Sequence, residues 1–456
     1  MSQFTRVTVS ESEFDGVPAI RIEKLLSLIS ASEFKDKVIE HLKVAGHEKE
    51  YVAITGASTL FNRVEEVKKR YVKFDVLTTF DQVNFKLAAA GENEHDRSLF
   101  RISFDSHEAI KFPDNDDENA RQAIIDDLNK AGEPIYDSQN QFFSKVFKFN
   151  IYANSLLASS DSVRVNIVDT NLKLLKSYYT GVNASKPANR KLIKHRYRML
   201  QEVSTGKYFF RAMISPRYQD YNIGMSVFVA LLSLHHAANE HKKIYIIREF
   251  SYTESTISVI FENTKGVIDK RLGEVRFQVL LTNNETTKGA VKLSGMFAIM
   301  VKVDGNIVPL EASQQQRNQK KYADKILSIS HAHKPETAIA AMNTMTLLKT
   351  VEEQLFKEVG EIGTAKTAEQ LKNLFKERLD NSRSLISSEA THKQLETLFK
   401  QQADSFLGLL EIMGKAQLII EQDGAEAKEV LRYIVHSVLF DTEAPSDNLE
   451  EDGDKE

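Results

Sequence analysis

Apolar residues recur at helical spacing in several segments of the first third of the chain. In residues 20–46, Ile22, Leu25, Leu26 and Ile29 fall on one face of a helix, which predicts helical structure that ends near Gly46. Alternating apolar positions and turn residues predict the other elements. In chain order these are a short buried strand over 50–58, a helix over 59–72, strands over 73–80, 84–90 and 98–105, an amphipathic helix over 114–133, and strands over 141–154 and 162–170.

The middle third is the most strand-rich part of the sequence. Strands are predicted over 207–215, 242–252, 256–263, 273–285 and 289–303, and a long apolar segment predicts a helix over 222–240. The residues just before this region, 189–203, have the spacing of a basic helix. From about residue 313 onwards, runs rich in Leu, Ala, Glu and Lys predict successive helices with short polar breaks.

These patterns predict an α+β protein with a mixed α/β body, a strand-rich middle third and a helical C-terminal region. We divide the chain into 1–184, 185–311, a helical region over 312–440 and a disordered acidic tail over 441–456. The tail carries a formal charge of −7, so the remaining residues sum to +3 within an overall charge of −4. The body is therefore mildly basic and carries an acidic extension.

Composition excludes some chemistry. The chain of 456 residues contains no cysteine, which rules out disulfides, a thiolate nucleophile and cysteine-bound metal and suits a reducing cytoplasm. The N-terminus lacks the pattern of a signal peptide, and no apolar run approaches about 18 residues, so we expect no membrane association.

Motifs that resemble catalytic or cofactor sites lack essential residues. The turn AITGAS (53–58) is not followed by the further glycines that a dinucleotide site requires, and DNDDEN (114–119) lacks the glycine and glutamate of a calcium loop. Neither the pair His235–His236 nor the His331-x-His333 motif supplies enough ligands for zinc. We find no nucleophile elbow, and we predict no catalytic residue, no metal and no cofactor.

Positive charge is concentrated in residues 185–217, which hold nine Lys and Arg residues and one Glu. In the predicted helix, Lys191, Lys194 and Arg198 share a face, and the helix leads into the strand KYFFRAMIS (207–215). Cations neutralise phosphates and aromatic rings stack on bases, so the combination favours nucleic-acid binding. The alternative is a solvated basic helix before an ordinary core strand. The predicted nucleic-acid-binding residues are Lys191, Lys194, Arg196, Arg198, Lys207, Tyr208, Arg211, Arg217, Tyr218 and Tyr221.

Two segments carry a resemblance to a known family. The first contains Ser215, Pro216, Arg217 and Tyr218, then Asp220 and Asn222 before a helix; the second contains Leu281, Asn283, Glu285, Gly289 and Ala290. Together, about residues 205–310 resemble the phage/plasmid-like domain-of-unknown-function family numbered 932. The chain departs from that family's Cys-x-Asn-Gly turn, since Met300 to Asp304 precede Gly305 and Asn306. The resemblance implies an α+β fold and an origin in a bacteriophage or plasmid, with no catalytic residues.

The sequence therefore predicts a non-enzymatic nucleic-acid-binding protein of a phage or plasmid, located in the cytoplasm of a bacterial host. It would act in DNA replication, recombination or protection, with DNA, including single-stranded DNA, as a partner in preference to RNA. The alternative is a virion component or scaffold that self-associates through its helical C-terminal region. The acidic tail could cover the basic body or recruit a basic protein.

Overall fold

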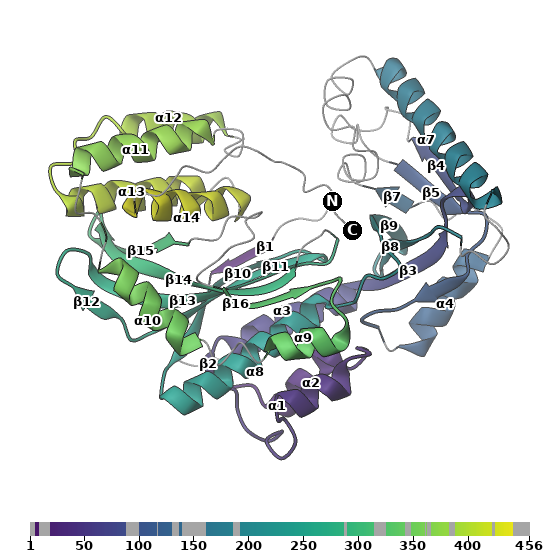
Figure 1. Cartoon of the computed structure of the whole chain (residues 1–456), viewed down its shortest axis with the longest axis horizontal. Helices are drawn as coiled ribbons and strands as arrows, with labels where there is room; N and C mark the ends of the chain where they lie inside the picture. The colour runs from purple at the N-terminus through teal and green to yellow at the C-terminus, as the bar shows by residue number, and fades with distance from the viewer. Residues whose placement is uncertain are drawn as a thin grey trace.

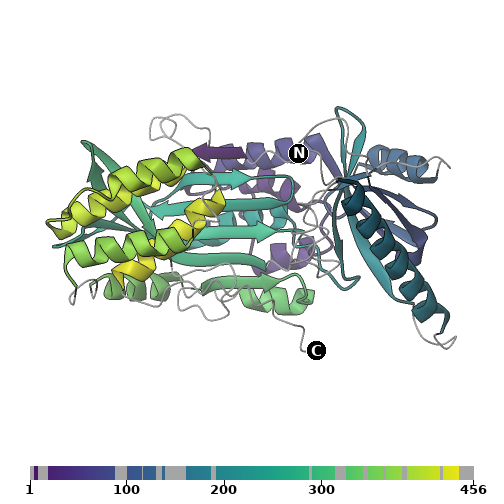
Figure 2. The ribbon, with the colours of Figure 1, turned by 90° about the horizontal axis from the view of Figure 1, so that it is seen from above.

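The computed structural model describes residues 5–8, 19–87, 100–115, 117–129, 136–138, 161–185, 192–286, 290–313, 325–342, 348–360, 362, 366–382, 388–421 and 425–440. In this part of the chain, two β-sheets lie side by side along the long axis of the molecule, one of nine strands and one of seven (Figure 1). The view from above shows the same separation (Figure 2). The predicted mixed α/β architecture is confirmed, and helices form the C-terminal region. The predicted tail lies outside the described residues.

The nine-stranded sheet has the order β1-β10-β11-β13-β14-β15. In addition β12 pairs with β13, β16 with β14, and β2 lies parallel to β10. Its strands are β1 (Thr5–Thr8), β2 (Ile54–Thr55), β10 (Tyr245–Tyr252), β11 (Thr256–Asn263), β12 (Val267–Asp269), β13 (Gly273–Asn284), β14 (Ala290–Val303), β15 (Asn306–Ala312) and β16 (Lys325–Ser330). Alternating residues such as Val259 and Phe261 are buried in the core, as the sequence periodicity requires.

The seven-stranded sheet has the order β4-β5-β7-β9-β8-β3-β6, and only β7 and β9 run parallel among the described pairs. Its strands are β3 (Tyr71–Thr79), β4 (Val83–Leu87), β5 (Phe100–Phe104), β6 (Ala109–Lys111), β7 (Tyr136–Ser138), β8 (Lys194–Glu202) and β9 (Lys207–Ile214). Both sheets thus combine strands from before and after residue 185, so the sequence ranges 1–184 and 185–311 do not correspond to separate sheets.

Helices cover the nine-stranded sheet from two sides (Figure 1). Below it in this view are α1 (Ile22–Leu25), the short 3-10 helix η2 (Leu26–Ile29), α2 (Lys35–His41), α3 (Ala57–Arg70), α8 (Ile223–His241), α9 (Pro335–Met342) and α10 (Leu348–Val359). Above it are α11 (Ala368–Asn381), α12 (Glu389–Leu398), α13 (Phe406–Ile420) and α14 (Ala425–Leu439). Most of α8 is buried, which explains why its sequence is apolar on nearly every face.

The second sheet carries α4 (Glu118–Asn129) and α7 (Asp161–Ala184), and the 3-10 helix η3 (Phe80–Gln82) joins β3 to β4 (Figure 1). Two main apolar cores correspond to the two sheets. One contains residues between 20 and 64 and between 221 and 439; the other contains residues between 72 and 210. We call β1 and the described residues within 19–70 and 221–440 the first lobe, and the described residues within 71–214 the second lobe. The second lobe is inserted between α3 and α8 of the first.

Three local predictions are wrong. Residues 162–170, predicted as a strand, belong to α7, because Leu172, Leu175 and Tyr179 continue a helical spacing that is longer than the short alternating run. The predicted helix over 189–203 is instead the strand β8. Residues 325–330, predicted as helical, form β16, whose apolar residues are buried where the strand pairs with β14. The predicted strand over 141–154 lies outside the described residues.

The correction at β8 has a clear physical reason. In this strand Tyr197 and Met199 point into the core of the second lobe, while Arg196 and Arg198 share the opposite face. A two-residue alternation of this kind is the signature of a strand. The helical prediction placed Lys191, Lys194 and Arg198 on one face, but the apolar residues of 194–202 follow the two-residue period of a strand.

Candidate functional site at the junction of the two sheets

Charged and polar side chains fill the space where the two lobes meet. We call the eight charged residues there the polar junction: Lys73, Asp75, Asp114, Arg196, Arg198, Arg211, Asp220 and Glu285. They comprise four cations and four carboxyl groups, and their side chains are between 1% and 13% exposed. Groups buried to this degree are normally paired, because an isolated buried charge is costly.

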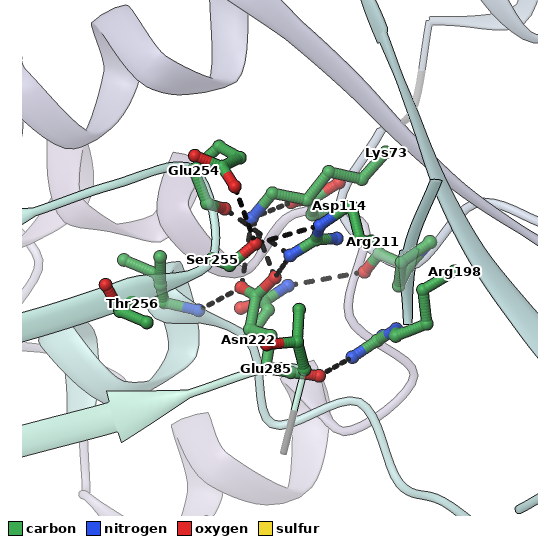
Figure 3. A network of polar contacts seen from close by, with 12 residues as sticks. Lys73, Asp114, Arg198, Arg211, Asn222, Glu254, Ser255, Thr256 and Glu285 are labelled. Atoms are coloured by element: carbon green, nitrogen blue, oxygen red, sulfur yellow. Dashed lines mark hydrogen bonds and ion pairs between the residues drawn. The ribbon is translucent and has the colours of Figure 1, made fainter. Parts of the chain in front are cut away.

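Glu285, which directly follows β13, is the residue on which the junction converges (Figure 3). Its carboxylate accepts hydrogen bonds from Lys73 Nζ at 2.9 and 3.0 Å and from Arg211 Nη2 at 2.6 Å. Its backbone oxygen accepts from Arg198 Nη1 at 2.6 Å. All three cations belong to strands of the second lobe, so one residue of the first lobe binds three strands of the other.

The start of helix α8 adds a further contact to the same carboxylate. The backbone N–H of Ile223 donates to Oε1 of Glu285 at 2.8 Å, and Asn222 caps the helix by accepting from the Met225 N–H at 2.8 Å. The first N–H groups of a helix lack partners within the helix and carry partial positive charge. The Glu285 carboxylate therefore satisfies one of these groups while it also binds Lys73 and Arg211.

A second set of ion pairs lies beside the first. Arg196 and Arg198 both donate to Asp75 on the neighbouring strand β3, through their Nε atoms at 3.0 and 3.2 Å. Both also contact Asp220, which lies in the segment between β9 and α8. Two arginines that share two carboxylates in this way leave few donors for any other partner.

An aromatic pair completes the junction. The rings of Tyr218 and His331 are stacked with centroids 4.4 Å apart, and the Arg198 guanidinium lies 4.9 Å from the Tyr218 ring centroid. The Tyr218 hydroxyl donates to the Glu285 backbone oxygen at 2.9 Å. The two ring nitrogens of His331 face the Gln219 carbonyl at 3.1 Å and Asn283 Oδ1 at 3.2 Å, and a neutral imidazole can donate to only one of them.

Burial and neighbouring charges shift the pKa values in this region. Burial opposes ionisation of Asp75, but the Arg198 and Arg196 guanidiniums outweigh it and lower the pKa of that carboxyl. Burial likewise opposes ionisation of Glu285, and Lys73 and Arg211 reverse the effect, so its pKa is also lowered. The pKa of Asp114 is raised, chiefly by burial, although its carboxyl lies 3.3 Å from Lys73 Nζ.

A small cavity adjoins Lys73 and Asp114. Its volume is about 20 Å³, and Leu28, Asn222 and Gly224 contribute to its lining. This space is enough for about one water molecule and too small for a substrate. The junction therefore has the chemistry of a closed ionic contact between lobes, with its carboxylates already bound to cations.

The structure places the residues predicted to bind nucleic acid in different environments. Arg196, Arg198 and Arg211 are buried in the polar junction, Tyr218 is stacked on His331, and Tyr221 is 2% exposed, with its hydroxyl bound to the His333 carbonyl at 2.8 Å. The three arginines and Tyr221 are therefore enclosed, while Tyr218 is half-buried with one ring face against His331. The positive charge of the arginines is directed at carboxylates of the same chain.

The remaining predicted residues lie nearer the surface. Lys207 and Arg217 are exposed, and Lys194 is half-buried and paired with Glu108. The Tyr208 hydroxyl donates to Asp127 at 2.8 Å and accepts from Gln201 at 2.9 Å. Lys191 lies outside the described residues.

The structure also brings together polar residues from two distant segments of the sequence, 215–222 and 281–286. Tyr218, Asp220 and Asn222 come from the first segment, and Asn283 and Glu285 from the second, and all five meet at the junction. Asn283, for example, donates to the Tyr221 carbonyl at 2.9 Å. The polar positions of both segments therefore have a shared location, which sequence spacing alone did not indicate.

The predicted binding residues did not include Lys73, Asp75, Asp114, Asp220, Glu285 or His331, which the structure places in this site. A signal for two of them was present, because Lys73 and Asp75 interrupt an otherwise apolar strand at positions that face the same side. Charged residues inside such a strand require partners. Nothing local to the sequence indicated that the partners would be Glu285 and the two arginines of β8.

The histidines considered as metal ligands make other contacts. His235 Nδ1 accepts from the Ala53 N–H at 3.0 Å, and His236 Nε2 donates to the Leu42 carbonyl at 2.9 Å. Among the described residues there is no group of three or more His, Asp or Glu side chains placed to hold a metal ion. Nor does any helix in the described ranges have the length and apolar character needed to cross a membrane.

No family model, curated protein or solved structure matches this chain. The resemblance to the phage/plasmid-like family therefore stays a prediction.

Proposed function

We propose that the protein binds nucleic acid electrostatically and without catalysing a reaction on it, with DNA as the preferred partner. The observation that supports this proposal is a cluster of exposed cations, Lys69, Arg70 and Lys207, which we call the strand-end cluster. These residues come from two basic runs that are far apart in the sequence, at the end of α3 and at the start of β9. The resemblance of residues 205–310 to a phage/plasmid family supports a role on the DNA of such an element.

Strand pairing brings the two runs together. Tyr71 pairs with Glu202, and Glu202 pairs with Lys207, so α3 ends beside the β8–β9 turn. The Val203 N–H donates to the Arg70 carbonyl at 2.9 Å. The Arg70 side chain is 63% exposed and forms an ion pair with Glu202 at 2.9 Å. Because the cluster has three cations and this one carboxylate neighbour, its net charge is positive. Exposed cations can approach phosphates, whereas the arginines of the polar junction are enclosed.

A further exposed cation, Arg217, lies at the opposite end of the β8–β9 hairpin. Arg196 pairs with Ile214, so Arg217 and Lys194 are at the same end of these strands. Arg217 and the strand-end cluster therefore mark the two ends of one hairpin. A backbone that followed the hairpin would meet cations at both ends.

Fluorescence anisotropy with labelled single-stranded DNA, duplex DNA and RNA tests the proposal. Three phosphate contacts predict a slope of log K against log salt of about −2 for single strands and about −3 for duplex. The double variant Lys69→Gln/Lys207→Gln should reduce the magnitude of that slope by about 1.4 for single strands and about 1.8 for duplex. Lys376→Gln/Lys400→Gln, which changes two exposed lysines of the helical region, should leave it unchanged. Absence of binding at about 50 mM salt, where such contacts are strong, would exclude the proposal.

Self-association is the rival proposal. The helices of the C-terminal region bury residues such as Phe375, Met413 and Ile434 within the chain, but Leu407 and Leu418 on α13 are 64% and 41% exposed. Mass photometry without nucleic acid distinguishes the two proposals: a defined large oligomer favours assembly, and a monomer with salt-dependent DNA binding favours the first.

A further inference from the structure

The two lobes have separate apolar cores, and the contact between them is polar. No residue of the first-lobe core belongs to the second-lobe core among the described residues. The chain passes between the lobes twice, where α3 meets β3 and in the segment 215–220 that connects β9 to the first lobe. The contacts that bridge the lobes include Lys73 and Arg211 with Glu285, Arg211 with Ser255 at 3.0 Å, and Asn222 with the Pro113 carbonyl at 3.3 Å.

We propose that the polar junction is a latch that holds the lobes in a closed arrangement and can open without unfolding either lobe. Separating two charged surfaces costs less free energy than the strength of their ion pairs suggests, because water solvates the ions that are freed. Each lobe keeps its own core when they part. Relative motion of domains is expected unless their interface is large and apolar.

Glu285 is the residue on which closure depends. From the second lobe, Lys73 and Arg211 bind its carboxylate and Arg198 binds its backbone oxygen. From the first lobe, its carboxylate accepts from the Ile223 N–H. If this carboxylate is neutralised, Lys73 and Arg211 lose their shared partner, and separation of the lobes would hydrate both cations. Opening would turn these cations and Arg198 towards solvent.

The chain provides a matched control for this charge. Glu262 is also buried and binds two arginines, Arg248 at 2.5 Å and Arg276 at 3.0 Å. All three residues belong to strands of one sheet in the first lobe. Glu262→Gln therefore removes an equally buried negative charge without altering the contact between lobes. A charge-balancing variant is Arg211→Gln/Glu285→Gln, which removes one cation with the carboxylate and leaves the Lys73–Asp114 pair.

Single-molecule energy transfer measures the opening directly. Because the chain has no cysteine, Ser177→Cys on α7 and Lys376→Cys on α11 provide one dye position in each lobe of the full-length protein. With no other substitution in the labelled protein, we expect a single narrow distribution of energy-transfer efficiency. Glu285→Gln should raise the population of an open state by about tenfold or more, since it removes the buried carboxylate that Lys73 and Arg211 share across the lobes. Arg211→Gln/Glu285→Gln should restore the closed distribution.

The controls separate opening from general destabilisation. Glu262→Gln should lower the midpoint of thermal unfolding without changing the energy-transfer distribution of the folded protein. The latch is excluded if Glu285→Gln and Glu262→Gln give the same distribution. It is equally excluded if Glu285→Gln unfolds both lobes in one transition and Arg211→Gln/Glu285→Gln does not restore folding, because the junction would then be part of a single cooperative core. These measurements require no nucleic acid, so they test the latch independently of the proposed function.

Discussion

The ammonium of Lys73 lies 2.9 Å from the Glu285 carboxylate although 212 positions separate the two residues in the chain. One lies on a strand of the seven-stranded sheet and the other at the end of a strand of the nine-stranded sheet. This pair and the neighbouring Arg211–Glu285 pair join two lobes that share no apolar core in the described residues. Ion pairs therefore form part of the contact between the lobes.

Replacing Arg198 should strongly destabilise the protein. Arg198→Met leaves Asp75 and Asp220 with one arginine in place of two and removes the bond to the Glu285 backbone. Loss of one partner from a buried ion pair costs about 3–5 kcal/mol. Arg217→Met, at an exposed position, should change the free energy of unfolding by less than about 0.5 kcal/mol. Chemical denaturation measures both, and equal effects would contradict the assignment of Arg198 to a buried network.

The protein should lose stability as the pH falls from about 6.5 to about 4, in part because of His331. Burial lowers the pKa of His331 to about 4, below its ordinary value of 6.5. The unfolded chain therefore binds a proton in this range before the folded protein does, and protonation favours unfolding. The full shift corresponds to about 3 kcal/mol.

Urea denaturation at a series of pH values tests this expectation by comparison with His331→Gln. The variant loses the ring stack on Tyr218 and should be less stable at every pH. Its free energy of unfolding should nevertheless fall less steeply between about pH 6.5 and 4, because it lacks the group that titrates. Parallel profiles for the two proteins would show that His331 does not remain neutral in the folded state.

Two glycines in helices should respond in opposite ways to alanine. A Cβ at Gly224, in the first turn of α8, would overlap the backbone carbonyl of Leu28, which cannot move independently of its helix. Gly224→Ala should therefore lower the free energy of unfolding by about 1–3 kcal/mol. A Cβ at Gly181 in α7 meets nothing within 4 Å, and Gly181→Ala should stabilise by up to about 1 kcal/mol through helix propensity. Thermal unfolding measures both changes, and a stable Gly224→Ala variant would contradict the close approach of α8 to η2.

The capping box of α11 should contribute measurably to the stability of the helical region. The Thr367 hydroxyl accepts from the Gln370 N–H at 3.2 Å, and the Gln370 side chain accepts from the Thr367 N–H at 2.8 Å. Thr367→Ala should lower the free energy of unfolding by about 1 kcal/mol. Thr367→Ser, which keeps the hydroxyl, should restore most of that loss. Equal losses in both variants would assign the effect to the threonine methyl group.

Much of the fold was predictable because it depends on local periodicity. The alternation in 256–263 and 273–285 and the apolar length of 222–240 correctly predicted β11, β13 and α8. The helices over 368–381 and 425–439 were predicted for the same reason. Prediction failed at β8, where a run of charged residues was assigned to a helix, and at β16, where a short strand follows a polar segment. In both places the pairing with a distant strand decides the structure.

The sequence by itself determined that the chain is an α+β protein, that positive charge gathers between residues 185 and 217, and that the chain has no cysteine chemistry. Tertiary structure alone decided how that charge is used. Arg196, Arg198 and Arg211 face Asp75, Asp220 and Glu285, whereas Lys207 is exposed at the β8–β9 turn. The physical reason is that secondary structure follows from neighbouring residues, but the environment of a charged side chain depends on which distant segment folds against it.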